Sequence, residues 1–245
     1  MRNSVLITGV GKGLGLEILK ESLNKNFYVF GVVRDKKDYK NLLKETKNQD
    51  CKLFYGDIKD QKLLNNIFKT SKKLKKNINC LVNNAGERQR KDFLKISKKE
   101  LSKIFTNNFF NHFFLTQIFL KNLPKKFKNA SVVNIGSIVG VRGFAQLGGY
   151  ASTKSALDGL TKSLAIEFKK RKVRFNIVHP GFVKTSYYEK FKKNKSALYN
   201  WTLKKIPLNR WGESNEISKM VCFLLSEDAS YLTGQSINID GGWTV

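Results

Sequence analysis

A tyrosine and a lysine four residues apart, Tyr150 and Lys154, have the greatest potential for chemistry in this sequence. Residues at this spacing lie on one face of a helix, and the small residues around them predict a helix that begins near Tyr150. An ammonium group beside a phenol stabilises the phenolate, so we expect the pKa of Tyr150 to fall from about 10 toward neutrality. The phenol would then exchange a proton as a general acid in carbonyl chemistry. Taken alone, such a pair is more often two ordinary surface neighbours.

The N-terminal segment supplies a possible partner for this chemistry. An apolar run over residues 4–7 predicts a strand, four glycines follow between Gly9 and Gly15, and apolar residues at helical spacing follow the glycines. A glycine turn lets the backbone approach a phosphate, while the helix N-terminus offers free N–H groups and a partial positive charge. The strict G-x-G-x-x-G fingerprint is absent, because Leu14 and Leu16 stand where its third glycine belongs. A glycine-rich turn without a ligand is the alternative.

Polar and small residues also follow two later strands. One apolar run ends in Asn83, Asn84, Ala85 and Gly86, and another ends in Ser137, which precedes Tyr150 by thirteen residues. Ligands of an open parallel sheet bind outside the carboxyl ends of its strands. We therefore expect these segments, the glycine turn and Tyr150 to border one crevice.

The rest of the chain repeats the alternation of strand and helix. Further strand candidates cover residues 29–33, 51–54, 80–83, 132–135, 174–178 and 236–239, with helical patterns between them. This alternation predicts an α/β fold, with a parallel sheet covered by helices on both faces. The 245 residues fit one large domain, and no low-complexity linker divides them.

Together these motifs resemble the short-chain dehydrogenase/reductase family over essentially the whole chain. The matching residues are Thr8, Gly9, Gly13, Gly15, Gly56, Asp57, Asn83 to Gly86, Asn108, Ser137, Tyr150, Lys154, Pro180, Gly181 and Asp240 to Gly242. The resemblance implies a single Rossmann-type domain over residues 1–245 and an NAD(P)-dependent oxidoreductase that interconverts C=O and CH–OH groups. Residues 206–213 and 229–235 are most similar to the bacterial 3-oxoacyl-acyl-carrier-protein reductase branch, although related carbonyl reductases share much of this sequence.

The resemblance implies a role for each of four catalytic residues. Tyr150 would protonate the carbonyl oxygen, and Lys154 would lower the pKa of Tyr150 and hold the ribose of the nicotinamide. Ser137 would hydrogen-bond the reacting oxygen. Asn108 would hold a water of the proton relay, with Asn107 and Asn111 as alternatives in other registers.

The end of the second strand bears on the choice of cofactor. An arginine there suits the 2′-phosphate of NADP, whereas a carboxylate suits the ribose hydroxyl of NAD. Arg34 and Lys12 favour NADPH over NADH, and Asp35 is the opposing signal. By resemblance, we expect the cofactor to contact Thr8, Gly9, Gly11, Lys12, Gly13, Leu14, Gly15, Arg34, Asp57, Ile58, Asn84, Ala85, Gly86, Tyr150, Lys154, Pro180, Gly181, Val183 and Thr185.

The net charge of +27 is the most unusual global property of the chain. Lysine clusters over residues 72–76, 125–128, 169–172 and 190–195 would attract a polyanion such as an acidic carrier protein. The alternative is compositional, because Lys, Asn, Phe and Ile are abundant together. No nucleic-acid-binding module is recognisable, so we expect no specific nucleic-acid partner.

Other features point to a cytoplasmic enzyme without a metal. The three cysteines lack metal-ligand spacing and are expected to be reduced, and neither a signal peptide nor a membrane span is predicted. His112 and His179 are interpreted as structural residues. The resemblance implies a substrate lid over about residues 185–210, containing Tyr187, Tyr188, Tyr199 and Trp201, and a homotetramer, with a dimer as the alternative.

The leading functional hypothesis is NADPH-dependent reduction of a 3-oxoacyl-acyl-carrier protein to its (3R)-hydroxy product in fatty-acid synthesis. A reductase or dehydrogenase of another small carbonyl or sugar is the alternative within the family. A non-catalytic nucleotide-binding or polyanion-binding protein on the same fold is the alternative from another class.

Overall fold

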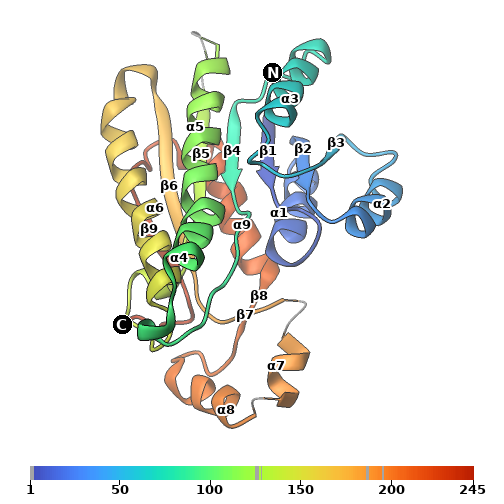
Figure 1. Ribbon diagram of the computed structural model, residues 1–245. Coiled ribbons are helices and arrows are strands. Elements are labelled where there is room, and N and C mark those ends of the chain that lie inside the picture. The colour runs from blue at the N-terminus through green and yellow to red at the C-terminus, as the bar shows by residue number, and fades with distance from the viewer. Residues whose placement is uncertain (1–2, 125–126, 128, 186–187, 195) are drawn as a thin grey trace.

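The computed structural model describes residues 3–124, 127, 129–185, 188–194 and 196–245, which fold around a seven-stranded parallel sheet (Figure 1). The strand order is β3-β2-β1-β4-β5-β6-β9. The strands are β1 (Ser4–Thr8), β2 (Tyr28–Val33), β3 (Cys51–Tyr55), β4 (Cys80–Asn83), β5 (Ala130–Ile135), β6 (Val173–Pro180) and β9 (Ser236–Ile239). Each strand predicted from the sequence is present, with bounds that differ by at most a few residues.

The central strands are buried along their whole length because helices cover both of their faces. Every residue of β1, β4 and β5 is buried. Parallel strands covered on two sides carry continuous apolar runs instead of alternating ones. The predicted α/β fold with a doubly covered parallel sheet is confirmed.

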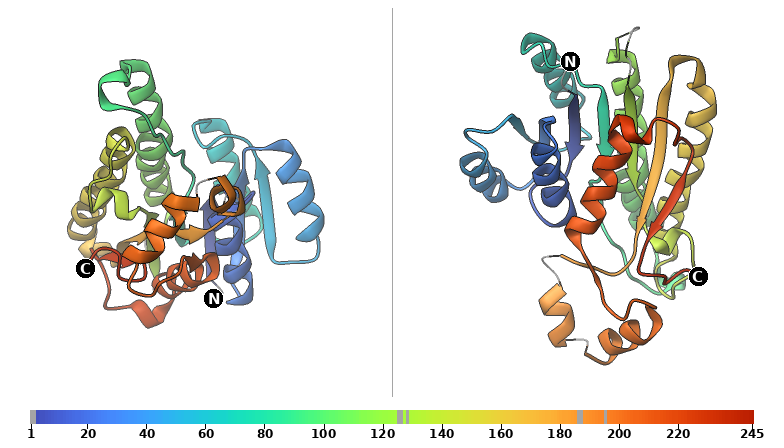
Figure 2. Two further views of the ribbon diagram at one scale, coloured as in Figure 1. Left: turned by 90° about the horizontal axis from the view of Figure 1, so that it is seen from below. Right: turned by 180° about the vertical axis from the view of Figure 1, so that it is seen from behind.

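The helices form one layer on each face of the sheet (Figure 2). One apolar core joins the sheet to α1 (Gly13–Asn24), α2 (Lys36–Glu45) and α9 (Ser214–Leu225). A second core joins the opposite face to α3 (Gln61–Lys73), α5 (Asn111–Asn122) and α6 (Gly148–Glu167). Shorter helical segments are η1 (Phe93–Lys95), α4 (Lys98–Phe105), η2 (Thr106–Phe110), η3 (Ile138–Gly140), η4 (Lys169–Arg171) and η5 (Glu227–Ala229).

Two helices project beyond the carboxyl end of the sheet, where the sequence predicts a lid (Figure 1). They are α7 (Tyr188–Asn194) and α8 (Ser196–Lys205), flanked by the short pair β7 (Val183–Lys184) and β8 (Gly212–Glu213). An aromatic cluster beneath them includes Tyr188, Phe191, Trp211 and Trp243. Tyr187 of the predicted lid lies outside the described residues. Within the part of the chain that the structure describes, no helix is both long and apolar enough to cross a membrane.

The cysteines are protonated thiols held in or against the core. Burial raises the pKa of Cys51 and Cys80 to about 12 and that of Cys222 to about 11. All three are free. At neutral pH these thiols are therefore poor nucleophiles.

Candidate functional site

A cleft of about 490 Å³ lies at the carboxyl ends of β1 to β4, beside the N-terminus of α1. Most of the residues predicted to hold a cofactor border it. They are Gly9, Gly11, Lys12, Leu14, Gly15, Arg34, Asp57, Ile58, Asn84, Ala85 and Gly86. The structure therefore brings together four segments that are spread over residues 9–86 of the sequence.

The glycine turn is closely packed against its own backbone. Gly9 has a φ of +72°, in the region that favours glycine, and a Cβ on Gly15 would stand 2.1 Å from the carbonyl oxygen of Gly9. The Asn84 side chain donates to the carbonyl oxygens of Thr8 and Gly9, at 2.9 and 3.2 Å. This arrangement leaves space at the N-terminus of α1 that fits a dinucleotide pyrophosphate, which backbone N–H groups there would hold.

Within the segment from Thr8 to Gly15, two of the predicted cofactor contacts, Thr8 and Gly13, do not border the cleft. Thr8 is buried, and its hydroxyl oxygen accepts from the N–H groups of Asn84 and Ala85 at 3.0 and 2.9 Å. Thr8 therefore joins β1 to β4 beneath the cleft. Gly13, with a φ of +58°, begins α1. A Cβ added to Gly13 would have the Cβ of Thr185, at 3.9 Å, as its nearest neighbour.

The charged side chains at the end of β2 differ in how freely they face the cleft. Arg34 is exposed and forms an ion pair of 3.3 Å with Glu87, which also borders the cleft. The Asp35 carboxylate caps α2, accepting from the N–H groups of Lys37 and Asp38 at 2.8 and 2.9 Å. The hydrogen bond from Asp38 is the largest of the contributions that lower the pKa of Asp35. One oxygen of Asp35, Oδ1, thus caps the helix, a role that the sequence interpretation missed, while the residue also borders the cleft.

A second cavity, of about 440 Å³, adjoins the first at Leu14, which borders both. Ser137 and Tyr150 lie on its wall, as do the predicted residues Pro180, Gly181, Val183 and Thr185. Aromatic side chains from the lid and nearby loops form much of the remaining wall. They are Phe144, Phe182, Tyr188, Phe191, Trp201 and Trp211.

Tyr150 lies in the first turn of α6, as the sequence predicts, with Lys154 one turn later. The Lys154 ammonium is 5.8 Å from the centre of the Tyr150 ring and donates to the carbonyl oxygen of Ile135 at 2.7 Å. Lys154 is only 4% exposed, and burial lowers its pKa to about 8. The lysine is thus held beneath the cavity and pointed at the end of β5.

The prediction that Lys154 lowers the pKa of Tyr150 is wrong in this structure. Burial raises the pKa of Tyr150 above 10, while a hydrogen bond with Ser137 and the charge of Arg88 act in the opposite direction. The sequence shows the spacing of the two side chains but not their desolvation, which disfavours the phenolate. Tyr150 therefore stays protonated at neutral pH, which suits a proton donor.

Two cationic residues at the substrate cavity were missed from the sequence. Arg88 and Arg90 line the same cavity as Tyr150, and Arg88 also acts on the pKa of Tyr150. They lie two and four residues after Gly86, in the loop after β4. Their position after a predicted strand end was the signal that could have identified them.

Asn108 lies in a π-helical turn, Thr106–Phe110, that interrupts α4 and α5. Its side-chain oxygen accepts from the N–H of Glu87 at 2.8 Å, and its amide donates to the Glu87 carbonyl at 2.9 Å and to Thr153 at 3.2 Å. Asn108 thus joins the loop after β4 to α6. The alternatives Asn107 and Asn111 border the cofactor cleft instead. π-turns often occur at functional sites, but no periodicity in the sequence indicates this one.

His112 and His179 are both fully buried. Burial lowers the pKa of His112 to about 3, so this ring is neutral at physiological pH. His179 contacts the backbone of Ser137.

Comparison with known proteins agrees with this geometry. The family model described as enoyl-(acyl carrier protein) reductase matches residues 9–244. A 3-oxoacyl-[acyl-carrier-protein] reductase of Buchnera aphidicola subsp. Schizaphis graminum is 34% identical over 98% of this chain and 97% of its own. The solved structures of a 4-hydroxyisoleucine dehydrogenase complexed with NADH (28% identity) and of ElxO with NADP bound (30% identity) each superpose with a TM-score of 0.90 over 99% of both chains. The chain belongs to the short-chain dehydrogenase/reductase family of NAD(P)-dependent oxidoreductases.

Proposed function

We propose that this protein uses NADPH to reduce a ketone to a secondary alcohol, with 3-oxoacyl-acyl-carrier protein as the substrate and the (3R)-3-hydroxyacyl form as the product. The observation that carries the proposal is that two cavities adjoin at Leu14, one at the glycine turn and one with Ser137 and Tyr150 on its wall. The proposed setting is cytoplasmic fatty-acid synthesis, an expectation that comes from the sequence.

The bound nicotinamide would supply the hydride, and the side chains of this chain would manage the proton. Tyr150 has a raised pKa, so it carries its proton at neutral pH and can donate it to the carbonyl oxygen. The Ser137 hydroxyl would orient that oxygen. The Lys154 ammonium would stabilise the phenolate that remains after proton transfer. Asn108 would hold the loop after β4 against α6 while the proton is replaced.

Two side chains support NADPH over NADH. Arg34 and Lys12 border the cleft and can flank a 2′-phosphate. The Asp35 carboxylate, which would favour the ribose hydroxyl of NADH, already caps α2. Asp35 and Asp38 both border the cleft and are the acidic side chains that oppose this choice.

The apolar wall of the substrate cavity supports an acyl substrate. A relative that is named as a 3-oxoacyl-[acyl-carrier-protein] reductase supports the carrier-linked form of that substrate. Arg88 and Arg90 favour a second candidate, a small carbonyl compound with an anionic group near the ketone. A non-catalytic binding protein is less well supported, because Ser137 and Tyr150 share one cavity with Lys154 directly beneath.

Some basic residues that the sequence assigned to carrier binding have other roles. The Arg171 guanidinium donates to the carbonyl oxygens of Leu120 and Leu123 at the end of α5, at 3.1 and 3.2 Å, so it is a structural contact instead of a free cation. Lys169 and Lys170 are exposed and remain candidates. Lys125, Lys126 and Lys128 lie outside the described residues.

We also propose a homotetramer. Phe110 and Phe114, beside and on α5, are 44% and 55% exposed, and Ile166 near the end of α6 is 71% exposed. Large apolar side chains on neighbouring helices are typical of a surface that another subunit covers.

A turnover screen tests the proposal. Purified protein with NADPH or NADH is offered a 3-oxoacyl thioester, the carrier-linked form of the same acyl group, and small ketones with and without a carboxylate. The proposal predicts the highest kcat/KM for the carrier-linked thioester with NADPH. A clear preference for an anionic small ketone would identify the second candidate, and no turnover of any ketone would contradict both.

A further inference from the structure

His179, at the carboxyl end of β6, lies against the peptide of Ser137. The ring is completely buried, with Nδ1 at 3.2 Å from the backbone nitrogen and 3.1 Å from the carbonyl oxygen of Ser137. A Cβ on Gly136 would stand 2.4 Å from Nδ1, so the glycine is what leaves room for the ring. The histidine therefore has one polar neighbour on this side, and it is the backbone of a proposed catalytic residue.

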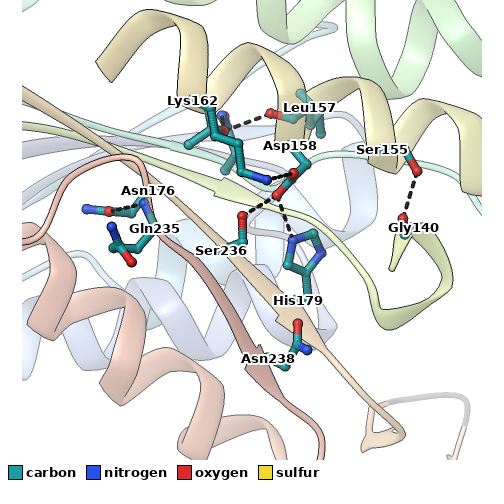
Figure 3. A network of polar contacts seen from close by, with 12 residues as sticks. Gly140, Ser155, Leu157, Asp158, Lys162, Asn176, His179, Gln235, Ser236 and Asn238 are labelled. Atoms are coloured by element: carbon teal, nitrogen blue, oxygen red, sulfur yellow. Dashed lines mark hydrogen bonds and ion pairs between the residues drawn. The ribbon is translucent and has the colours of Figure 1, made fainter. Parts of the chain in front are cut away.

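The opposite side of the ring faces Asp158 of α6 (Figure 3). One carboxylate oxygen lies 3.2 Å from Nε2 of His179 and also accepts from the Ser236 hydroxyl. The other oxygen accepts from the Lys162 ammonium at 2.6 Å. Burial alone would raise the pKa of Asp158, but the hydrogen bonds from Lys162, Ser236 and His179 lower it, so the group is a carboxylate at neutral pH.

This arrangement fixes the tautomer of the histidine. A carboxylate only accepts hydrogen bonds, so Nε2 must carry the proton that it shares with Asp158. In the neutral ring, Nδ1 then carries no proton, and its lone pair accepts a hydrogen bond from the N–H of Ser137. Burial lowers the pKa of His179, and the charge of Lys154 acts in the same direction, while the contacts with Asp158 and Ser137 partly oppose the shift. The ring is therefore neutral at pH 7.

The same helix that carries Tyr150 also carries Asp158, which is linked through His179 to the backbone of Ser137. Tyr150 lies in the first turn of α6, and Asp158 lies two turns later. Ser155, between them, donates to the carbonyl oxygen of Gly140 at 2.8 Å and holds the far end of the turn that Ser137 begins (Figure 3). Both ends of this turn are thus held from α6.

We propose that Asp158 and His179 are positioning residues, in which Asp158 selects the His179 tautomer that orients the Ser137 peptide toward Tyr150. The kinetic part of this inference rests on the proposed ketone reduction. The structural part, the tautomer itself, does not.

The test is Asp158→Asn. The ammonium of Lys162 would attract the amide oxygen, so the amide nitrogen would turn toward His179 and donate to Nε2. The proton would then move to Nδ1, where it faces the carbonyl oxygen of Ser137, and the N–H of Ser137 would lose its acceptor. In Asp158→Asn with Lys162→Met, the amide is free to turn its oxygen back to Nε2 and restore the original tautomer. Lys162→Met alone is the matched control.

Ring 15N chemical shifts report the tautomer directly, and the sequence holds only two histidines. His112→Gln assigns the two sets of signals. We expect the Nε2–H form of His179 in the wild type and in Lys162→Met, the Nδ1–H form in Asp158→Asn, and a return to Nε2–H in the double variant. An unchanged tautomer in Asp158→Asn would overturn the inference even if no ketone substrate has been found.

Kinetics test the consequence for catalysis with whichever ketone is reduced. We expect Asp158→Asn to lower kcat about tenfold, with little change in the KM for the cofactor, and Lys162→Met to restore most of the loss. In a Ser137→Ala background, Asp158→Asn should cause little further loss, because the group that it positions is already gone. An equal loss in both backgrounds, or wild-type kcat in Asp158→Asn, would show that the pair does not act through Ser137.

Discussion

The two halves of the active-site crevice are built in different ways. The cofactor half uses the backbone of a glycine turn and short polar residues at strand ends, and its central contact is between two glycines, Gly9 and Gly15. The substrate half uses large side chains from loops and from the lid, such as Phe144, Tyr188 and Trp211.

This difference separates what must stay constant from what can vary. A dinucleotide has a fixed shape, so the backbone that holds it leaves little freedom in sequence. A pocket of side chains can change its shape and charge by substitution while the sheet stays the same. The following experiments probe the two halves separately.

The largest effect is expected in the substrate half, from Tyr150→Phe. Loss of the proton donor should lower kcat by a factor of about 10² or more and leave NADPH affinity nearly unchanged. Stopped-flow and cofactor titration measure the two quantities. Tyr199→Phe is a matched control, because it removes a hydroxyl from the same half, one that lies 2.9 Å from the Tyr188 hydroxyl. Near-normal kcat in Tyr150→Phe would contradict the assigned chemistry.

In the cofactor half, we expect Gly15→Ala to reduce activity more than any other substitution of a glycine by alanine. The new Cβ would stand 2.1 Å from the Gly9 carbonyl oxygen, so the turn must move. We expect kcat/KM for NADPH to fall on the order of 10-fold to 10²-fold, the effect of a misplaced binding group. Gly159→Ala adds the same methyl group where nothing lies within 4 Å and should have no kinetic effect. Equal behaviour of the two variants would show that the turn is not rigid.

Arg34→Ala tests which cofactor the first half selects. The KM for NADPH should rise about tenfold more than the KM for NADH, because only NADPH has the phosphate that loses a charged partner. Lys37→Ala is the control for charge alone, since Lys37 does not border the cleft. A wild-type preference for NADH would instead assign the 2′ position to an acidic side chain such as Asp38.

The pH dependence of kcat should have a basic limb that belongs to Lys154. Its pKa is lowered to about 8 by burial, so the ammonium is present below about pH 8 and is lost as the pH rises through that value. Tyr150, with a raised pKa, still carries its proton in this range. At saturating cofactor, kcat should halve near pH 8, and Lys154→Arg, which keeps its charge, should lack this limb. A limb that persists in Lys154→Arg belongs to another group.

The smallest effect is expected for charge outside both halves. Lys169→Glu with Lys170→Glu should lower kcat/KM for a carrier-linked substrate by about twofold to threefold at low salt, through slower encounter. The kcat for a small thioester should not change. If both substrates respond alike, the lysine content of the chain is compositional.

The sequence predicted the sheet well and named most of the strand-end and glycine-turn residues that border the first cleft, because their signals are local. The strand of residues 4–7 and the glycines after it have a pattern that only a few conformations satisfy. The start of the helix near Tyr150 is also local, and α6 begins at Gly148. The residues of the second cavity, by contrast, meet only in three dimensions.

The predictions that were wrong or missed share one physical cause. The environment of a side chain in the fold is not determined by the residues next to it in the sequence. Burial reverses the expected shift in the pKa of Tyr150. The cap formed by Asp35 and the π-turn around Asn108 depend on backbone geometry that hydrophobic periodicity does not encode. Arg88 acts on Tyr150 across the cavity, although 62 positions, from 88 to 150, separate them in sequence.

The positions of the tryptophans mean that their fluorescence reports on the substrate half of the crevice alone. Of the three in the sequence, Trp201 and Trp211 line the substrate cavity, and Trp243 lies 5.4 Å from Trp201 between ring centres. Intrinsic tryptophan emission from this protein therefore originates beside α7 and α8 and away from the glycine turn. Trp201 is 45% exposed and Trp211 only 6%, so a closing lid would shift the emission of the first toward the blue and change the second little.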